Sequence, residues 1–462
     1  MEPEIGAGLL DQTIWSRIAC STGHSDHHEE PEKRRQTRPY SVRTPARLPV
    51  SIVPIHASDS PCFLRSSAKD SSSRPTRWMS QIWTLRAFYR RSRGKMPSPM
   101  TDNLTDLIRS WDGTGVITRY DSPTETWIFI CLHDDSLGPC TGGTRMKVYA
   151  SPAEGLRDAM RLAAGMTAKW AGIGMAAGGG KAVLAVPRVF EGEERRGLLG
   201  RYGALIETLG GSFHTGEDLG TTTEDMRFLA EATHFVHGFD PDTDEKIDPS
   251  PYTARGVLAA IQAGLAQTFS SADPAGRTIL IQGTGNVGRE LAGLLARAGA
   301  TLLLSDIDTA RAEDLAQNLG AQSVAPDEVY TTACDVYAPC AVGATLTAET
   351  IPQLACRIVA GSANNQLEEP ADAERLARRD ILYVPDFITN SGGAMAFGLL
   401  SQGAKPGEEL FAQIDGIGEL VTAVLGEAAE SGESPLAAAE RRVQETLEQA
   451  RADHFGSGAD EG

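Results

Sequence analysis

The sequence contains no uninterrupted apolar run that approaches the roughly 20 residues needed to span a bilayer. It also lacks the cysteine spacing of a disulfide framework or a zinc site, because its seven cysteines are odd in number, scattered and without a C-x-x-C pair. We therefore expect no membrane insertion and no metal site. Scattered, reduced cysteines favour the cytoplasm as the compartment.

Positive charge is scarce outside the first 95 residues. The net charge is −18. Residues 1–95 carry 16 Lys and Arg against 9 Asp and Glu, so the remainder has a net charge of about −25. An acidic body repels a phosphate backbone, and we therefore expect no nucleic-acid partner. An anionic cofactor would have to be held by local groups.

The length and composition are those of a globular protein with two or three domains. The chain has 462 residues, of which 41% are hydrophobic, so it can bury a sizeable core. The first segment differs, because its basic and polar runs show no apolar period. We interpret 1–100 as a disordered or non-native extension, with the genuine start at Met96 or Met100.

The remainder predicts an α/β protein. Apolar spacing in 101–250 predicts a strand at 127–132, a helix at 153–170, and a Gly-rich turn from 172 that leads into a strand at 182–186. In 251–390, strands and helices alternate, which implies a parallel sheet with right-handed crossovers. The expected strands are 278–281, 301–305, 336–338, 358–360 and 382–384, and the expected helices are 253–267, 286–298 and 309–319. Residues 391–462, largely helical over 408–453, are expected to pack back on the first domain.

A Gly-rich loop follows the first strand of this alternating region. Gly283-Thr284-Gly285-Asn286-Val287-Gly288 lies between a buried strand and a helix, where glycines permit a tight turn and close approach of backbone N–H groups to a pyrophosphate. Asp306 ends the next strand, the expected place for a carboxylate that binds the adenosine ribose. Because a carboxylate repels a 2′-phosphate and no Arg follows at once, NAD is favoured over NADP. The second domain is thus predicted as a Rossmann-type, doubly wound dinucleotide-binding domain after an N-terminal α/β substrate domain.

Two lysines and one aspartate stand in unusual settings. Lys169 ends an apolar helix, Lys181 follows three glycines and opens a strand, and Asp218 lies in a turn-like segment. Desolvated lysines can exchange protons near neutral pH. Spacing alone leaves the alternative open that each lysine is a surface residue and Asp218 a helix cap or turn residue.

Eight blocks, in order between about 101 and 400, resemble the Glu/Leu/Phe/Val dehydrogenase family, and most closely its leucine and phenylalanine dehydrogenases. They are GGTRM at 142–146, GMTAK at 165–169, GGGK at 178–181, EDLGT at 217–221, DPSPYT at 248–253, APCA at 338–341, AGSANNQL at 360–367 and NSGG at 390–393. The resemblance implies reversible oxidative deamination of a hydrophobic L-amino acid to its 2-oxo acid and ammonia, with hydride transfer to NAD, in a homo-oligomer.

The resemblance also implies residue roles. Lys169 would bind the substrate carboxylate with the help of Asn390, and Lys181 would polarise the substrate oxygen and activate water. Asp218 would tune Lys181 and relay protons. The residues expected near the nicotinamide are Thr253 and Asn364.

The side-chain pocket is expected to include Thr141, Gly142, Met166 and Gly216. Glutamate-specific members resemble this chain around 140–143 but have a Lys in place of Thr141, so glutamate is disfavoured here. Gly216 lacks a methyl group that leucine-type members carry, which hints at a larger or aromatic side chain. We interpret His214, His234 and His237 as structural.

Two alternatives remain at this stage. One is a catalytically silent, NAD-binding regulatory module on the same scaffold, against which the intact set of Lys169, Lys181 and Asp218 argues. The other is an NADP-linked glutamate dehydrogenase, which would require a cation near Thr141 that the sequence does not supply.

Overall fold

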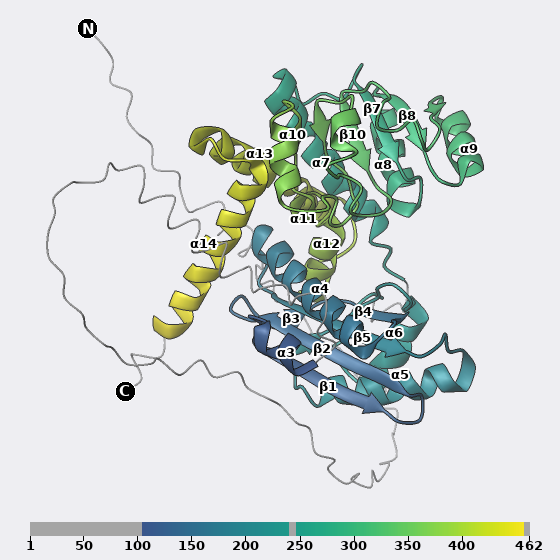
Figure 1. The fold of residues 1–462 in the computed structure, drawn as a ribbon, viewed down its shortest axis with the longest axis vertical. Coiled ribbons are helices and arrows are strands. Elements are labelled where there is room, and N and C mark those ends of the chain that lie inside the picture. The colour runs from purple at the N-terminus through teal and green to yellow at the C-terminus, as the bar shows by residue number, and fades with distance from the viewer. Residues whose placement is uncertain (1–103, 240–245, 457–462) are drawn as a thin grey trace, which may run out of the picture. The chain divides into compact units, whose positions relative to one another are not determined.

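The computed structural model describes residues 104–239 and 246–456, which belong to one compact unit of the chain, Ser51–Gly462. The predicted extension 1–100 lies outside the described residues. Two six-stranded sheets with their helices form the fold (Figure 1). Among the described helices, none combines the length and the apolar character that a membrane crossing requires.

The first sheet is mixed, with strand order β1-β2-β5-β3-β6 and β4 paired to β5. β1 and β2 run antiparallel to their neighbours, whereas β3, β4 and β6 are joined by parallel pairing to β5 or β3. The strands are β1 (Gly115–Asp121), β2 (Thr126–Asp134), β3 (Cys140–Thr141), β4 (Thr144–Val148), β5 (Gly178–Val186) and β6 (Phe213–His214). The predicted strand at 127–132 lies within β2.

Helices cover both faces of this sheet because its central strands are apolar on both sides. Val183 of β5 packs with Leu156 of α4 (Pro152–Gly172), whereas Leu184 packs with Tyr202 of α5 (Gly192–Glu207). Helix α6 (Thr223–Ala230) joins α5, and α3 (Leu104–Ser110) joins α4. The side chain of Ser151 caps α4 by accepting from the Glu154 N–H.

The Gly-rich turn predicted from residue 172 is present at 173–177, but the prediction that it extends to residue 181 is wrong. β5 already begins at Gly178, and Lys181 is the fourth residue of the strand and does not open it. The glycines serve packing: a Cβ added at Gly179 would lie 1.9 Å from the Thr167 hydroxyl oxygen. The missing side chains let α4 lie close against the strand.

The second sheet is parallel throughout, with order β12-β11-β10-β7-β8-β9. The chain proceeds outward from β7 in one direction and then from β10 in the other, which confirms the predicted doubly wound topology and puts the switch point between β7 and β10. The strands are β7 (Thr278–Gln282), β8 (Thr301–Ser305), β9 (Gln322–Ser323), β10 (Val336–Pro339), β11 (Ile358–Val359) and β12 (Leu382–Tyr383). The accompanying helices are α7 (Ser250–Phe269), α8 (Asn286–Arg297), α9 (Thr309–Leu319), η1 (Ile351–Gln353) and α10 (Ala371–Ala377).

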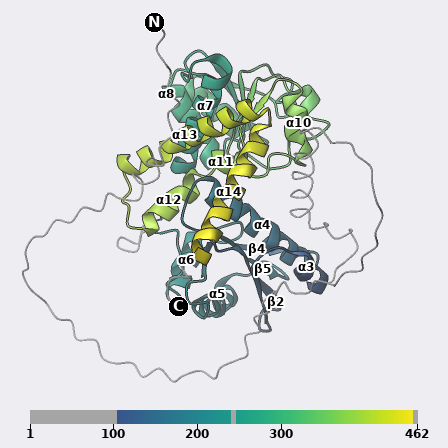
Figure 2. The same ribbon diagram turned by 90° about the vertical axis from the view of Figure 1, so that its left-hand side faces the viewer.

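Four further helices follow the second sheet: α11 (Asp386–Thr389), α12 (Gly392–Ser401), α13 (Glu408–Ser431) and α14 (Pro435–Gly456). The expectation that they pack on the first domain needs correction for α13, which packs along α7 and is tied to it by Arg255 and Asp415 at 2.5 Å. In contrast, α14 packs on α4, where Val443 and Leu447 meet Ala171 (Figure 2). The domain limits 101–250 and 251–390 stay a proposal.

Candidate active site

A cleft of about 970 Å³ is lined by residues of both sheet regions. Its walls come from the β3–β4 connection, α4, β5, the segment after β6, the start of α7, the loop after β11, and helices α11, α12 and α14. Eleven of the residues predicted from sequence line it: Thr141, Gly142, Met166, Lys169, Lys181, Gly216, Asp218, Thr253, Val287, Asn364 and Asn390. The structure thus brings together side chains that are up to 249 positions apart in the sequence.

Lys181 and Asp218 form an ion pair inside the cleft. The Lys181 Nζ lies 2.9 Å from the Asp218 Oδ2, and the two side chains are 8% and 24% exposed. Burial lowers the pKa of Lys181, although the Asp218 carboxylate opposes the shift. Burial alone would raise the pKa of Asp218, but the charges of Lys181 and Arg145 outweigh it and lower that pKa. Asp218 therefore stays ionised, while Lys181 can release its proton more readily than a surface lysine.

Two glycines make this approach possible. A Cβ added at Gly142 would lie 1.8 Å from the Gly180 carbonyl oxygen, and one at Gly143 would lie 2.9 Å from the Asp218 Cβ. The Gly-Gly pair therefore lets β5 and the segment that carries Asp218 lie close together, which positions the carboxylate beside Lys181.

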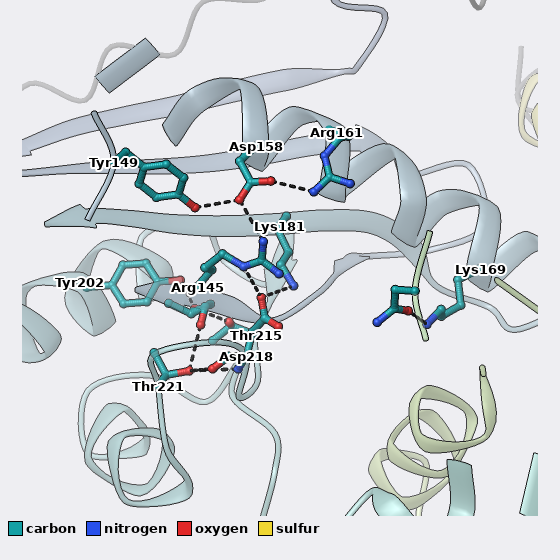
Figure 3. A network of polar contacts seen from close by, with 12 residues as sticks. Arg145, Tyr149, Asp158, Arg161, Lys169, Lys181, Tyr202, Thr215, Asp218 and Thr221 are labelled. Carbon is teal, nitrogen blue, oxygen red and sulfur yellow. Dashed lines mark hydrogen bonds and ion pairs between the residues drawn. The ribbon is translucent and has the colours of Figure 1, made fainter. Parts of the chain in front are cut away.

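Arg145 also lines the cleft, although the sequence analysis gave it no role. Its guanidinium donates to Asp218 at 3.0 Å and to Asp158 at 2.9 Å, and Tyr149 donates to Asp158 at 2.7 Å. Figure 3 shows this chain of contacts leading to Lys181, with Lys169 apart from it. The only earlier signal was the position of Arg145 inside the GGTRM block. Its contacts orient the Asp218 carboxylate.

Lys169 reaches the cleft from the last turn of α4. Its Nζ lies 3.5 Å from the Asn364 Oδ1, which also accepts from the Asn390 Nδ2 at 2.9 Å. Burial in the cleft lowers the pKa of Lys169 to about 8; Asp386 opposes the shift, and the like charge of Lys181 adds to it. A cation and two amides therefore converge where a carboxylate can bind.

Asn390 has hydrogen-bonding capacity left for a ligand. It is 6% exposed, and its Oδ1 has no hydrogen-bond partner within the described residues. A buried carbonyl oxygen without a donor costs free energy unless something binds it. The amide therefore offers an acceptor to a donor group that enters the cleft.

The Gly-rich loop fits a dinucleotide. Gly283 has φ +100°, and a Cβ at Gly288 would lie 1.9 Å from the Gly283 carbonyl oxygen, so the turn tolerates no side chain there. A Cβ at Gly285 would meet nothing, so this side of the loop is open. α8 begins at Asn286, and its N-terminal N–H groups are available to a pyrophosphate. Val287 lines the cleft, which joins the loop to the catalytic side chains.

Asp306 follows β8, as predicted, and its carboxylate is already engaged. It accepts from the Thr284 N–H at 2.7 Å and from Arg311 at 2.6 Å. Burial would raise the pKa of Asp306, but hydrogen bonds from Thr284, Asp308 and Arg311 outweigh it and lower the pKa to about 2. The prediction that no Arg follows at once overlooked Arg311, five positions on. The third residue of α9 reaches back to the strand end.

Two of the histidines interpreted as structural belong to the cleft. His214 and His237 line it, whereas the side chain of His234 is 91% exposed. Within the ranges 104–239 and 246–456, no group of three or more His, Cys, Asp or Glu side chains is arranged to hold a metal ion.

A doubly wound domain with a Gly-rich loop, beside a cleft that holds two lysines and an aspartate, defines a dinucleotide-dependent dehydrogenase. Comparison with family models agrees. The model for the Glu/Leu/Phe/Val dehydrogenase dimerisation domain matches residues 125–235, and that for Glutamate/Leucine/Phenylalanine/Valine dehydrogenase matches residues 303–402.

Individual relatives extend the match over most of the chain. Leucine dehydrogenase of Thermoactinomyces intermedius is 38% identical over 349 residues, which are 75% of this chain and 94% of that protein. Phenylalanine dehydrogenase of Lysinibacillus sphaericus is 36% identical over 324 residues, 69% of this chain and 84% of that one. The crystal structure of L-tryptophan dehydrogenase from Nostoc punctiforme is matched with a TM-score of 0.66 and 34% identity over 76% of this chain and 100% of that chain.

The chain therefore belongs to the Glu/Leu/Phe/Val dehydrogenase family, as the sequence blocks predicted. Family membership makes it an oxidoreductase that acts on the CH–NH₂ group with a nicotinamide cofactor.

Proposed function

We propose that the chain catalyses the reversible oxidative deamination of a hydrophobic L-amino acid to its 2-oxo acid and ammonia, with hydride transfer to NAD. The observation that carries the proposal is the shared cleft: the Lys181–Asp218 pair, Lys169 and Val287 of the nucleotide loop all line it. A group that binds a carboxylate, a group that moves protons and a dinucleotide site are the three requirements of this reaction.

Lys169 binds the α-carboxylate of the substrate. Its ammonium group, with Asn364 and Asn390 beside it, supplies a charge-assisted hydrogen bond in a partly desolvated site. This contact orients the α-carbon toward the part of the cleft where Thr253 and Val287 lie. Asn364 and Thr253 then define the face of the substrate that is oxidised.

Lys181 moves the protons. NAD, when bound, accepts the hydride from the substrate α-carbon. Neutral Lys181 first takes a proton from the substrate ammonium, because burial lowers its pKa and makes the neutral amine more accessible than that of a surface lysine. Asp218, 2.9 Å away, relays this proton onward, so that Lys181 can next take a proton from the water that adds to the iminium carbon left by hydride transfer. The ammonium form of Lys181, stabilised by Asp218, then returns that proton to the substrate nitrogen. Ammonia leaves as the carbon–nitrogen bond breaks, and neutral Lys181 accepts the hydroxyl proton, which gives the 2-oxo acid.

The side-chain pocket favours an apolar substrate. Thr141 stands where glutamate-specific relatives have a cation, and its hydroxyl donates to the Pro139 carbonyl at 3.1 Å. Two arginines that line the cleft are already paired, Arg145 with Asp218 and Asp158, and Arg161 with Asp158. A substrate γ-carboxylate would therefore lose its hydration without gaining a partner, which costs several kcal/mol.

Asp306 supports NAD as the cofactor, because its ionised carboxylate repels a 2′-phosphate and holds the Arg311 guanidinium, which could otherwise bind that phosphate. We also propose a homo-oligomer, since the matched model over 125–235 is described as a dimerisation domain. The five cysteines within the described residues are free, which suits a reducing cytoplasm.

The test is NADH formation at alkaline pH with L-Leu, L-Val, L-Phe, L-Trp and L-Glu, each with NAD and with NADP. Turnover of hydrophobic amino acids with NAD is expected. Lys181→Ala should lower kcat by at least about a hundredfold, whereas Lys147→Ala, a matched change at an exposed lysine on β4, should leave it unchanged. Full turnover by Lys181→Ala would refute the assigned chemistry. NADH binding without turnover of any amino acid would favour a silent module instead.

A further inference from the structure

Side chains alternate along the segment that leads from the catalytic aspartate into the substrate pocket. Phe213 and Thr215 are buried against the far side of the sheet, at 0% and 1% exposure. His214, Gly216 and Asp218 occupy the alternate positions, and together with Thr215 and Glu217 they line the cleft. Successive side chains of an extended strand point to opposite faces, so these three residues share one face. Isolated bridges of Thr215 with Val236 and of Glu217 with Thr144 continue the extended pairing beyond β6, and at about 3.3 Å per residue the path from His214 to Asp218 spans at most roughly 13 Å.

The interval between Asp218 and His214 is left open by a glycine. A Cβ added at Gly216 would meet only the backbone of His237, whose carbonyl oxygen would lie at 3.5 Å. The neighbouring strand places Thr141 directly beside His214 in the parallel ladder. A substrate whose α-carbon lies at the catalytic pair can therefore extend its side chain along Gly216 toward His214.

His214 is held by a second histidine. Its Nδ1 lies 3.1 Å from the His237 Nε2, and the two rings are stacked with centroids 5.3 Å apart and planes 20° apart. Phe235 adds a tilted ring 5.2 Å from that of His214. The backbone keeps the arrangement in register, because the Thr215 N–H donates to the Phe235 carbonyl and the His237 N–H donates to the Thr215 carbonyl.

The pair is uncharged at the pH where such an enzyme works. Burial, with a smaller contribution from the charge of His214, lowers the pKa of His237 to about 4. Burial also lowers the pKa of His214. The hydrogen bond between the rings satisfies one nitrogen of each. A neutral pair of this kind presents aromatic surface to the pocket, with no ionic charge to desolvate.

We infer that the His214–His237 pair forms the far wall of the substrate side-chain pocket and selects a planar aromatic side chain over a branched aliphatic one. The inference rests on the proposed function and specifies its substrate class. Aromatic rings gain from offset stacking or edge-to-face contact with other rings, beyond the area they bury. A leucine or valine side chain gains no such contact.

The experiment compares the ratio of kcat/KM for L-Phe to that for L-Leu in four proteins. The unmodified enzyme should give a ratio above one. His214→Leu, which removes the ring at similar size, should lower the ratio by about fivefold to tenfold, and His214→Phe should retain it. His234→Leu is the matched control, because its side chain is exposed, and it should leave the ratio unchanged. L-Trp and L-Val serve as a second pair of substrates.

A binding measurement separates this inference from the proposed reaction. Calorimetric titration of the NADH-bound enzyme with 3-phenylpropionate and with 4-methylpentanoate should show that His214→Leu weakens binding of the aromatic acid selectively. If thermal unfolding shows that His214→Leu does not fold, His237→Leu takes its place with the same expectation. Absence of turnover by the unmodified enzyme would sink the proposed function alone. An unchanged preference in the ring-removing variant, or an aliphatic preference in the unmodified enzyme, would overturn the inference.

Discussion

Replacing Asp218 by Asn should inactivate the enzyme and destabilise it in a pH-dependent way. The substitution keeps the size of the side chain and removes the charge that lies 2.9 Å from the Lys181 ammonium and 3.0 Å from the Arg145 guanidinium. Two neighbouring cations then share a site without a carboxylate between them. Lys181, at 8% side-chain exposure, has little water to compensate.

The size of the stability loss depends on whether Lys181 keeps its proton. Removing one partner of a buried ion pair costs about 3–5 kcal/mol when the remaining charge stays in place. Lys181 can limit this cost by releasing its proton, because burial has already lowered its pKa. A lysine whose folded pKa lies below its unfolded value destabilises the fold at low pH, and the penalty fades as the pH rises toward the unfolded pKa. The loss should therefore be about 3 kcal/mol near neutral pH and shrink by up to about 1.4 kcal/mol per pH unit above it.

Denaturant unfolding at several pH values and steady-state kinetics test this reasoning. We expect kcat to fall by roughly 10²- to 10⁴-fold, because Lys181 loses the carboxylate that stabilises its protonated form. Asp158→Asn is the control: it removes a charge from the other side of Arg145, 2.9 Å away, and leaves the Lys181–Asp218 pair intact. It should reduce stability and leave kcat within a few-fold. A stability loss in Asp218→Asn that does not vary with pH would refute the argument, as would a kcat above a tenth of the original.

Elements with local signals were predictable from the sequence. β8 spans the predicted residues 301–305 and α9 spans the predicted 309–319, since each has a strong apolar period and clear ends. The Gly-rich loop between β7 and α8 was predictable because its glycines, its strand and its helix are adjacent in the sequence. The same holds for Asp306, which simply follows a strand.

Features that depend on tertiary approach were not predictable in this way. The glycines at the start of β5 suggested a turn, because local propensity does not show that α4 packs against them. A Cβ at Gly179 would lie 1.9 Å from the Thr167 hydroxyl oxygen of α4. Arg311 was overlooked because it reaches Asp306 through the first turn of a helix and not through adjacency. His214 and His237 meet because Thr215 and Val236 form a parallel bridge across 21 positions, a pairing without a sequence motif. The convergence of Lys169, Lys181 and Asp218 was supplied by family resemblance, since spacing left it open.

Three further predictions test the close packing and the two ligand sites. Gly142→Ala should lower the free energy of unfolding by about 2 kcal/mol or more, because its Cβ would lie 1.8 Å from a carbonyl oxygen of β5. Gly165→Ala, which has open space around it on α4, should raise the free energy of unfolding by roughly 0.5–1 kcal/mol. Equal effects of the two changes in thermal unfolding would contradict the packing argument. The KM for the amino acid should rise as the pH passes about 8, because Lys169 loses the proton that binds the carboxylate, and Lys169→Arg should abolish this rise. Asp306→Asn should weaken NADH binding by about tenfold in a fluorescence titration, because the Thr284 N–H in the Gly-rich loop loses its charged acceptor. The same change frees the Arg311 guanidinium from its 2.6 Å contact, so binding of NADPH should improve relative to NADH; an equal loss for both would contradict the argument that Asp306 keeps Arg311 from a 2′-phosphate.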